Sequence, residues 1–277
     1  MKTIARHAID QELAEEGVER KKDVLESVVQ SAATRPPALN QVLRTAHSYA
    51  GYLSAAGGET EPLCAALKTG ARAADALFTL ASKSGEVEVD LGTQKVRLQS
   101  TGSTDTTDVG NWQVGWWIAH IVCDRRAIDV LRATPLEILR RSRTRGDECQ
   151  YLFVDALQAL ESRDADWSTR LQQAVDATDP EKAPLSDEEF VLNILVPQME
   201  LLFRFVKGEI APFNETLQFA LERHKKYWSK ASRKRDPDGY IALGPLAIAA
   251  MARKAGMPIE VQSDYLQKPL LEGRCCQ

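Results

Sequence analysis

The sequence predicts a mainly α fold: an irregular multi-helix domain with one inserted β-hairpin and a short extended C-terminal segment. Apolar residues recur at helical spacing through most of the 277 residues. The spacing changes to a strict alternation of apolar and charged residues only at 86–98, which indicates a hairpin with one buried face. No fixed period of about 20 to 50 residues runs through the chain, so a regular solenoid is not expected.

Proline and glycine divide the first part of the chain into three expected helices. Pro36 and Pro37 end the first helix, and Gly57 and Gly58 close the second. The third helix carries many alanines on its apolar face, a pattern typical of close helix packing. We expect these helices at about 9–33, 39–56 and 61–83.

The chain length suits one large domain or two small ones. We divide it into an N-terminal helical hairpin, residues 1–58, and a main helical domain, residues 59–277. The hairpin is expected to pack on the main domain, so that the two form one compact unit.

After the hairpin, a stretch rich in serine, threonine, glycine and aspartate at 100–110 predicts a flexible surface loop. Short helices are then expected at 111–123, 125–133, 136–143, 148–161 and 165–177. A proline-containing loop at 179–186 leads to two longer helices at 187–206, interrupted by Pro197, and at 212–229. The last helix is expected at 243–255, followed by an extended segment at 259–261.

The composition of the chain excludes several classes of protein. With 35 basic and 39 acidic side chains, the net charge of −4 excludes a polycationic nucleic-acid coat protein. The longest uncharged apolar stretch is shorter than the roughly 20 residues that cross a bilayer, and the N-terminus lacks the pattern of an export signal. Five cysteines without a CxxC pair predict free thiols in a reducing compartment. We therefore expect a cytoplasmic protein that is not a membrane protein.

Motifs for catalysis, cofactors and metals are absent from the sequence. It has no GxSxG elbow, HExxH pair, phosphate-binding loop or GxGxxG turn. His120 and Cys123 are one helical turn apart, but the other ligands of a zinc site are missing. We therefore expect no catalytic residues, no cofactor and no metal.

Several segments in the same order resemble one bacterial family. The run Gly239-Tyr240-Ile241-Ala242-Leu243-Gly244-Pro245, with its continuation to Leu266, is similar to the end of the immunity-49 family of polymorphic toxin systems. The segment 87–92, the Trp112 helix leading into Asp124-Arg125, and Tyr151 with residues 155–160 resemble further blocks, so the similarity spans roughly 70–271. The resemblance implies a helical, non-enzymatic cytoplasmic antidote that binds a toxin in interbacterial competition.

Charge is segregated along the chain. Residues 155–189 hold ten acidic and three basic side chains, a net charge of −7, whereas residues 222–238 carry +4. Such blocks either complement one another within the fold or present a partner surface. As contacts for the toxin we select an aromatic anchor and five acids from the acidic block: Asp164, Asp166, Trp167, Asp187, Glu188 and Glu189.

Two other function classes stay open at this point. An enzyme that reverses a toxin-made modification would use His120, Asp124 and Arg125, because one helical turn brings His120 and Asp124 to a common face. A helical scaffold could bind nucleic acid through the basic segment 225–235, although the acidic overall charge makes this unfavourable. A homo-oligomer is also open.

Overall fold

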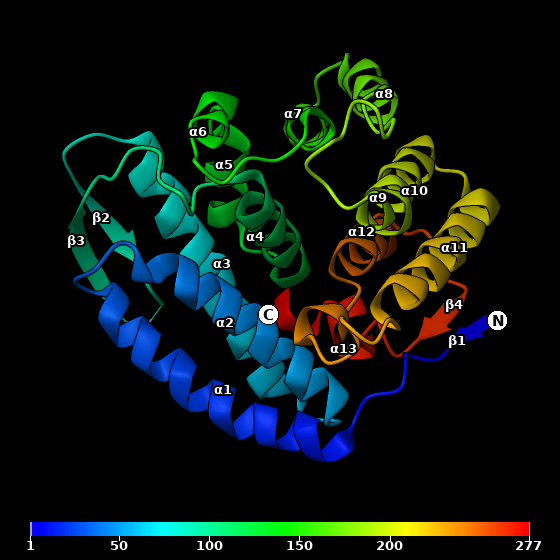
Figure 1. Cartoon of the computed structure of the whole chain (residues 1–277), viewed down its shortest axis with the longest axis horizontal. Coiled ribbons are helices and arrows are strands. Elements are labelled where there is room, and N and C mark those ends of the chain that lie inside the picture. Colours follow the sequence, from blue (N-terminus) through cyan, green and yellow to red (C-terminus); the bar gives the residue numbers. More distant parts are fainter. Residues whose placement is uncertain (1, 93, 277) are drawn as a thin grey trace.

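The computed structural model describes residues 2–92 and 94–276, and it is mainly helical, as the sequence predicts. Three helices along one side of the molecule pack each on the next (Figure 1). They are α1 (Gln11–Ala32), α2 (Ala38–Ala55) and α3 (Thr60–Ser82). Asp10 begins α1 by accepting the N–H of Leu13. The expected N-terminal helices are confirmed to within a few residues.

Helix α4 (Val109–Val122) contacts α3, α5 and α12 and belongs to the core. It is apolar nearly all round, and Trp112, Trp116 and Trp117 are buried. Gly115 allows α4 to approach α3 closely, since a Cβ at this position would lie 2.6 Å from the Cβ of Ala74. The alanines of α3 therefore serve helix packing, as expected from their number.

Four shorter helices follow along the chain, and each lies close to its predicted position. They are α5 (Arg125–Ala133), α6 (Leu136–Arg140), α7 (Glu148–Glu161) and α8 (Trp167–Asp176). The carboxylate of Asp147, next to the start of α7, accepts the backbone N–H groups of Leu185 and Ser186 at 3.0 and 2.6 Å. This contact ties the loop after α8 to the start of α7.

The C-terminal part is also helical, with irregular turns. Its elements are α9 (Glu188–Phe190), the π-helical η1 (Val191–Leu195), α10 (Val196–Lys207), α11 (Ile210–Trp228), the 3-10 turn η2 (Pro237–Gly239), α12 (Leu243–Lys254), α13 (Lys268–Leu271) and the 3-10 turn η3 (Arg274–Cys276). The interruption expected at Pro197 takes the form of η1, because proline has no N–H to donate to the preceding turn.

Two small sheets accompany the helices. Strands β2 (Glu86–Asp90) and β3 (Lys95–Gln99) form the predicted antiparallel hairpin, with Val89 and Leu98 buried. The C-terminal extended segment is β4 (Val261–Ser263), two residues later than expected. It pairs in parallel with β1 (Lys2–Ile4), a strand that the sequence analysis did not predict. Three residues are too few for a readable alternation.

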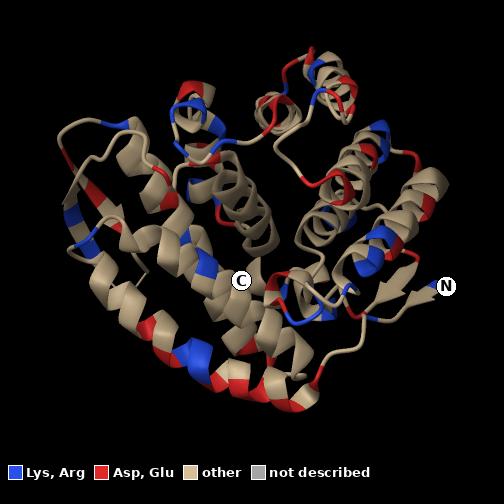
Figure 2. Ribbon diagram, viewed as in Figure 1, with Lys and Arg blue, Asp and Glu red and all other residues tan. Residues whose placement is uncertain are grey.

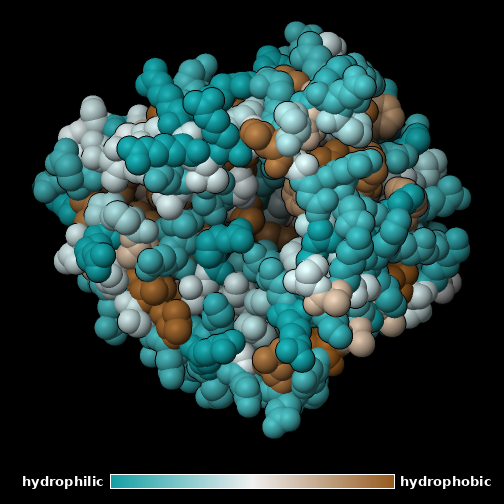
Figure 3. Space-filling view, viewed as in Figure 1, coloured by the Kyte–Doolittle hydropathy of each residue, from teal (hydrophilic) through white to brown (hydrophobic). Residues whose placement is uncertain are grey.

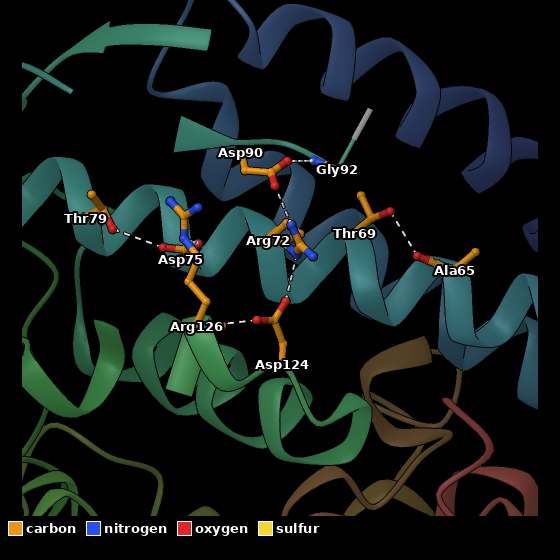
Figure 4. Close-up of polar contacts among 10 residues, drawn as sticks. Ala65, Thr69, Arg72, Asp75, Thr79, Asp90, Gly92, Asp124 and Arg126 are labelled. Carbon is orange, nitrogen blue, oxygen red and sulfur yellow. Dashed lines mark hydrogen bonds and ion pairs between the residues drawn. The ribbon is translucent and has the colours of Figure 1, made fainter. Parts of the chain in front are cut away.

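Ion pairs fasten the hairpin and α5 to α3 (Figure 4). Arg72 of α3 donates to Asp90 of the hairpin at 2.7 Å and to Asp124 at 2.8 Å. Asp75 is fully buried and lies 2.7 Å from the Arg126 guanidinium. Burial raises the pKa of Asp75, and Arg126 opposes that rise. These contacts hold three segments together that are distant in the sequence.

The segment at 100–108 is anchored, contrary to the expectation of a flexible loop. Thr107 is fully buried, and the Ser103 hydroxyl donates to the carbonyl of Ile138 at 2.7 Å. Asp108 begins α4 by accepting the N–H groups of Gly110 and Asn111. The polar residues of this segment therefore form hydrogen bonds within the fold and cap a core helix. For this reason, their polarity was a misleading indication of mobility.

The cysteines correct a further expectation. Cys64 of α3 is bonded to Cys275, and Cys123 at the end of α4 is bonded to Cys276. Cys149 is a buried free thiol. The expectation of free thiols is therefore wrong for four of the five cysteines. The partners are 211 and 153 residues apart, so only the fold brings them together.

One continuous set of buried apolar side chains includes residues from Ile4 to Cys275. It draws on α1, α2 and α3 as well as on the helices that follow them. The division into residues 1–58 and 59–277 stays a prediction.

Candidate functional site

The first three predicted contact residues lie together at the turn from α7 to α8. The Asp164 carboxylate accepts the N–H of Asp166 and pairs with Arg170 at 3.0 Å. Asp166 is exposed. Trp167 is half-buried and packs against the core. Part of this acidic charge is therefore compensated within the fold, and Trp167 presents only one side to solvent.

The other three lie at the start of α9, where the acidic block meets the basic segment. Arg233 pairs with Asp187 and, at 3.1 Å, with Glu189. Lys230 also pairs with Glu189. The hydrogen bond from Lys230, followed in size by the one from Arg233, lowers the pKa of the Glu189 carboxyl group. Glu188 is exposed beside them.

Internal pairing therefore accounts for part of both charge blocks. The Arg233 guanidinium also lies 4.0 Å from the centre of the Tyr227 ring, which fixes its position. Figure 2 shows acidic residues in the α8 and α9 region and basic residues on α11. Less of the basic segment is available to nucleic acid than its sequence suggests.

Apolar side chains that the sequence analysis missed lie beside this acidic surface. Leu185 is 64 % exposed and Leu192 is 46 % exposed. Leu192 and Glu188 line a pocket of about 230 Å³ with Pro180, Pro184 and Val191. Pro184 next to Leu185, ahead of the acids, was the available signal in the sequence. We name residues 178–192 the acidic apolar surface.

The residues considered for an enzyme are only partly brought together. Asp124 begins α5 by accepting the N–H of Ala127, and its other oxygen pairs with Arg72. Both carboxylate oxygens of Asp124 therefore have structural partners. Arg125 instead pairs with Glu161 of α7 at 2.6 Å, and His120 Nε2 lies 3.9 Å from the same carboxylate. The sequence analysis missed Glu161 because no short spacing links it to α4.

The electrostatics do not suit His120 to proton transfer near neutral pH. Its side chain is 8 % exposed. Burial, assisted by the positive charges of Arg125 and Lys254, lowers its pKa to about 3. The imidazole is therefore neutral at pH 7, and its Nε2 makes no hydrogen bond within the described residues. A base with such a pKa is a weak proton acceptor at that pH.

A cleft of about 760 Å³ lies beside His120. The end of α4, the start of α5, α10, α12 and the C-terminal tail line it. Phe205, Met251 and Leu271 give it an apolar wall, and Arg125, Arg253 and Lys254 add positive charge. The molecular surface also shows a central hollow with apolar side chains at its base (Figure 3).

Two other kinds of site are absent from the described residues. No cluster of three or more histidine, cysteine, aspartate or glutamate side chains there could hold a metal ion. Of the helices at 2–92 and 94–276, none has the length and apolar character that a membrane span requires.

Comparison with known proteins identifies the family. The model of the family described as Immunity protein 49 matches residues 59–268, which include α3 to α12 and β4. Neither the curated proteins nor the solved structures yield a match. The matched range covers most of the chain and agrees with the resemblance at about 70–271. The chain therefore belongs to the Immunity protein 49 family.

Proposed function

We propose that this protein is an immunity protein that binds a cognate bacterial toxin stoichiometrically and occludes its active site or substrate path, without chemistry of its own. The observation that carries the proposal is the family match over residues 59–268. A tight inhibitor needs an anchor that excludes water and charges that steer association. Exposed apolar side chains and exposed acidic side chains could supply the anchor and the steering charges.

We assign the toxin contact to Asp164, Asp166, Trp167, Asp187, Glu188 and Glu189, extended by Leu185 and Leu192. Exposed leucines next to carboxylates combine an apolar centre with a charged rim, the usual anatomy of a protein interface. The acidic surplus suits a toxin whose working surface is cationic, such as one that acts on nucleic acid.

Charge reversal tests this surface. The partner is the protein encoded by the neighbouring reading frame, and its binding is followed by stopped flow at several salt concentrations. The double variant Asp166→Lys with Glu188→Lys changes exposed acids and leaves the pairs of Arg233 and Arg170 intact. We expect slower association, by about tenfold or more at low salt, and a weaker salt dependence.

A matched control is available on α1. Glu12, Glu15 and Glu16 are exposed acids near the N-terminus, outside residues 164–189, and Glu12→Lys with Glu16→Lys makes the same change in net charge. We expect the control to bind like the wild type, apart from a small general charge effect. Equal slowing by both double variants would remove residues 164–189 from the interface while leaving the inhibitor proposal intact.

The cytoplasmic location belongs to the same proposal, and the disulfides make it testable. Cytosolic thiols are kept reduced by glutathione and thioredoxin, so a cytoplasmic protein would carry Cys123 and Cys276, the disulfide partners that solvent reaches, as thiols in living cells. Alkylation in intact cells followed by mass spectrometry measures this directly. Resistance of Cys123 and Cys276 to alkylation until a reductant is added would contradict the cytoplasmic location and indicate an oxidising compartment.

A further inference from the structure

The two disulfides of the C-terminal tail differ in their access to solvent. Cys64 and Cys275 are 8 % and 1 % exposed, so that bond is buried in the core. Cys123 is half-buried and Cys276 is exposed. Cys123 and Cys276 both line the cleft beside His120. Adjacent residues of one tail thus form one protected and one accessible bond.

A cation lies beside the accessible bond. The Lys254 ammonium lies 3.9 Å from the Cys123 sulfur. Arg253 lines the same cleft, together with Glu272 and with Arg125 and Glu161, which pair with each other. Nearby cations favour the thiolate form of cysteine, and a more stable thiolate is a better leaving group in disulfide exchange. The cleft is therefore electrostatically suited to release Cys123 as a thiolate.

We propose that the Cys123–Cys276 disulfide is a thiol–disulfide exchange site that takes small dithiols or reduced thiol peptides, while Cys64–Cys275 is structural. The attacking thiolate forms a bond to the exposed Cys276 sulfur, the bond from Cys276 to Cys123 breaks, and Cys123 leaves as a thiolate beside Lys254. A second thiolate, from the same dithiol or from a second thiol peptide, then attacks the reductant's sulfur in the mixed disulfide. It releases Cys276 as a thiolate, and the reductant becomes a disulfide after giving up two electrons.

The protected bond makes this exchange reversible. Cys275 stays bonded to α3 after Cys276 is released, so the tail remains attached beside α4. Within η3, reduction frees Cys276, which lines the cleft. In the reverse exchange, the disulfide form of the reductant takes up the two electrons, and only a short local movement of Cys276 back to Cys123 is required.

Graded reduction of the folded, oxidised protein tests the proposal. Samples are exposed to dithiothreitol for increasing times without denaturant, alkylated, and mapped by mass spectrometry. We expect Cys123 and Cys276 to react at least about tenfold faster than Cys64 and Cys275, because thiol exchange follows access to the sulfur. With glutathione as the probe, the adduct should form on Cys276. Equal rates, the opposite order, or an adduct confined to the buried pair would overturn the assignment.

A lysine substitution separates the role of charge from that of exposure. Lys254→Met should slow reduction of the Cys123 bond by about three- to tenfold, because the leaving thiolate loses its cation. Lys226→Met makes the same change at an exposed position of α11 that does not line the cleft. This variant should leave the rate of reduction unchanged. Equal rates for wild type and Lys254→Met would overturn the role of Lys254. The double variant Cys64→Ser with Cys275→Ser should keep the fast rate, and its loss would contradict an independent exchange site.

Discussion

Helix α4 and the acidic apolar surface at 178–192 use similar residue types in opposite ways. In α4, Trp112 and Trp116 are stacked with ring centres 4.8 Å apart and are almost inaccessible to solvent. In the surface segment, Leu185 and Leu192 are largely exposed and acids lie next to them. Apolar side chains in α4 contribute to folding, whereas those at 178–192 are available to a partner. Substitutions in the two regions should therefore affect different measurements.

Removal of residues 1–58 should have the largest effect. Helix α2 covers α3, which is buried along most of its length. Without the hairpin, the fragment 59–277 would expose that apolar face, so we expect it to aggregate or to lose cooperative unfolding. Circular dichroism and urea denaturation measure this. A cooperatively folded fragment would show instead that the range matched by the family model is an independent domain.

Tryptophan substitutions compare the two regions directly. Trp112→Ala should lower the free energy of unfolding by about 3–5 kcal/mol, because it leaves a cavity and removes the indole hydrogen bond to the Leu131 carbonyl. Trp167→Ala, at a half-buried position, should cost about 1 kcal/mol but weaken toxin binding. Urea titrations and binding assays on both variants measure this difference, and Trp112→Phe serves if the alanine variant does not fold. A core-sized stability loss at Trp167 without a change in binding would contradict our division.

Acid should destabilise the protein through its buried histidines. Burial lowers the pKa of His120 and of His224 to about 3, whereas the unfolded chain binds these protons below pH 6.5. The stabilising contribution is therefore present above pH 6.5 and is lost as the pH falls toward 3. Between pH 7 and 5.5 each histidine should account for about 1 kcal/mol of the free energy of unfolding. Urea titrations at the two pH values measure the change in the free energy of unfolding, which should be smaller by that amount in His120→Gln. An unchanged pH dependence would contradict the burial of His120.

The smallest effect is expected for the ion pairs of the acidic surface. Glu189→Gln removes the charge that pairs with Lys230 and Arg233 at a partly exposed site. Ion pairs at exposed sites contribute little to stability, so the urea midpoint should change little. The same variant should bind the toxin more slowly at low salt. A stability loss as large as that of a core substitution would mean that these acids stabilise the fold, as the tryptophans of α4 do.

The sequence predicted the long helices well because their apolar periodicity and their proline and glycine boundaries are local signals. The last helix, expected at 243–255, is α12 (Leu243–Lys254). Features that depend on distant partners were missed. Strand β1 pairs with β4 from the other end of the chain, and Cys64 meets Cys275 across 211 residues. Neither pairing leaves a local pattern in the sequence.

The candidate site shows the same limit. Charge counts correctly identified two opposite blocks, but not that Arg233 pairs with Asp187, 46 residues away. The spacing of His120 and Asp124 suggested a shared face, yet Asp124 caps α5 and Glu161 of α7 lies beside His120. Helical spacing describes one helix only, whereas a site is assembled from several. Leu185 and Leu192 were missed because exposure is a property of the folded chain.

The most direct test of the account is a titration of toxin activity with purified protein at concentrations far above the dissociation constant. Binding by occlusion predicts that activity falls linearly and reaches its minimum at one molecule of this protein per molecule of toxin. Complete protection at a small fraction of an equivalent, without a stable complex on size-exclusion chromatography, would contradict it and show that the protein acts by turnover.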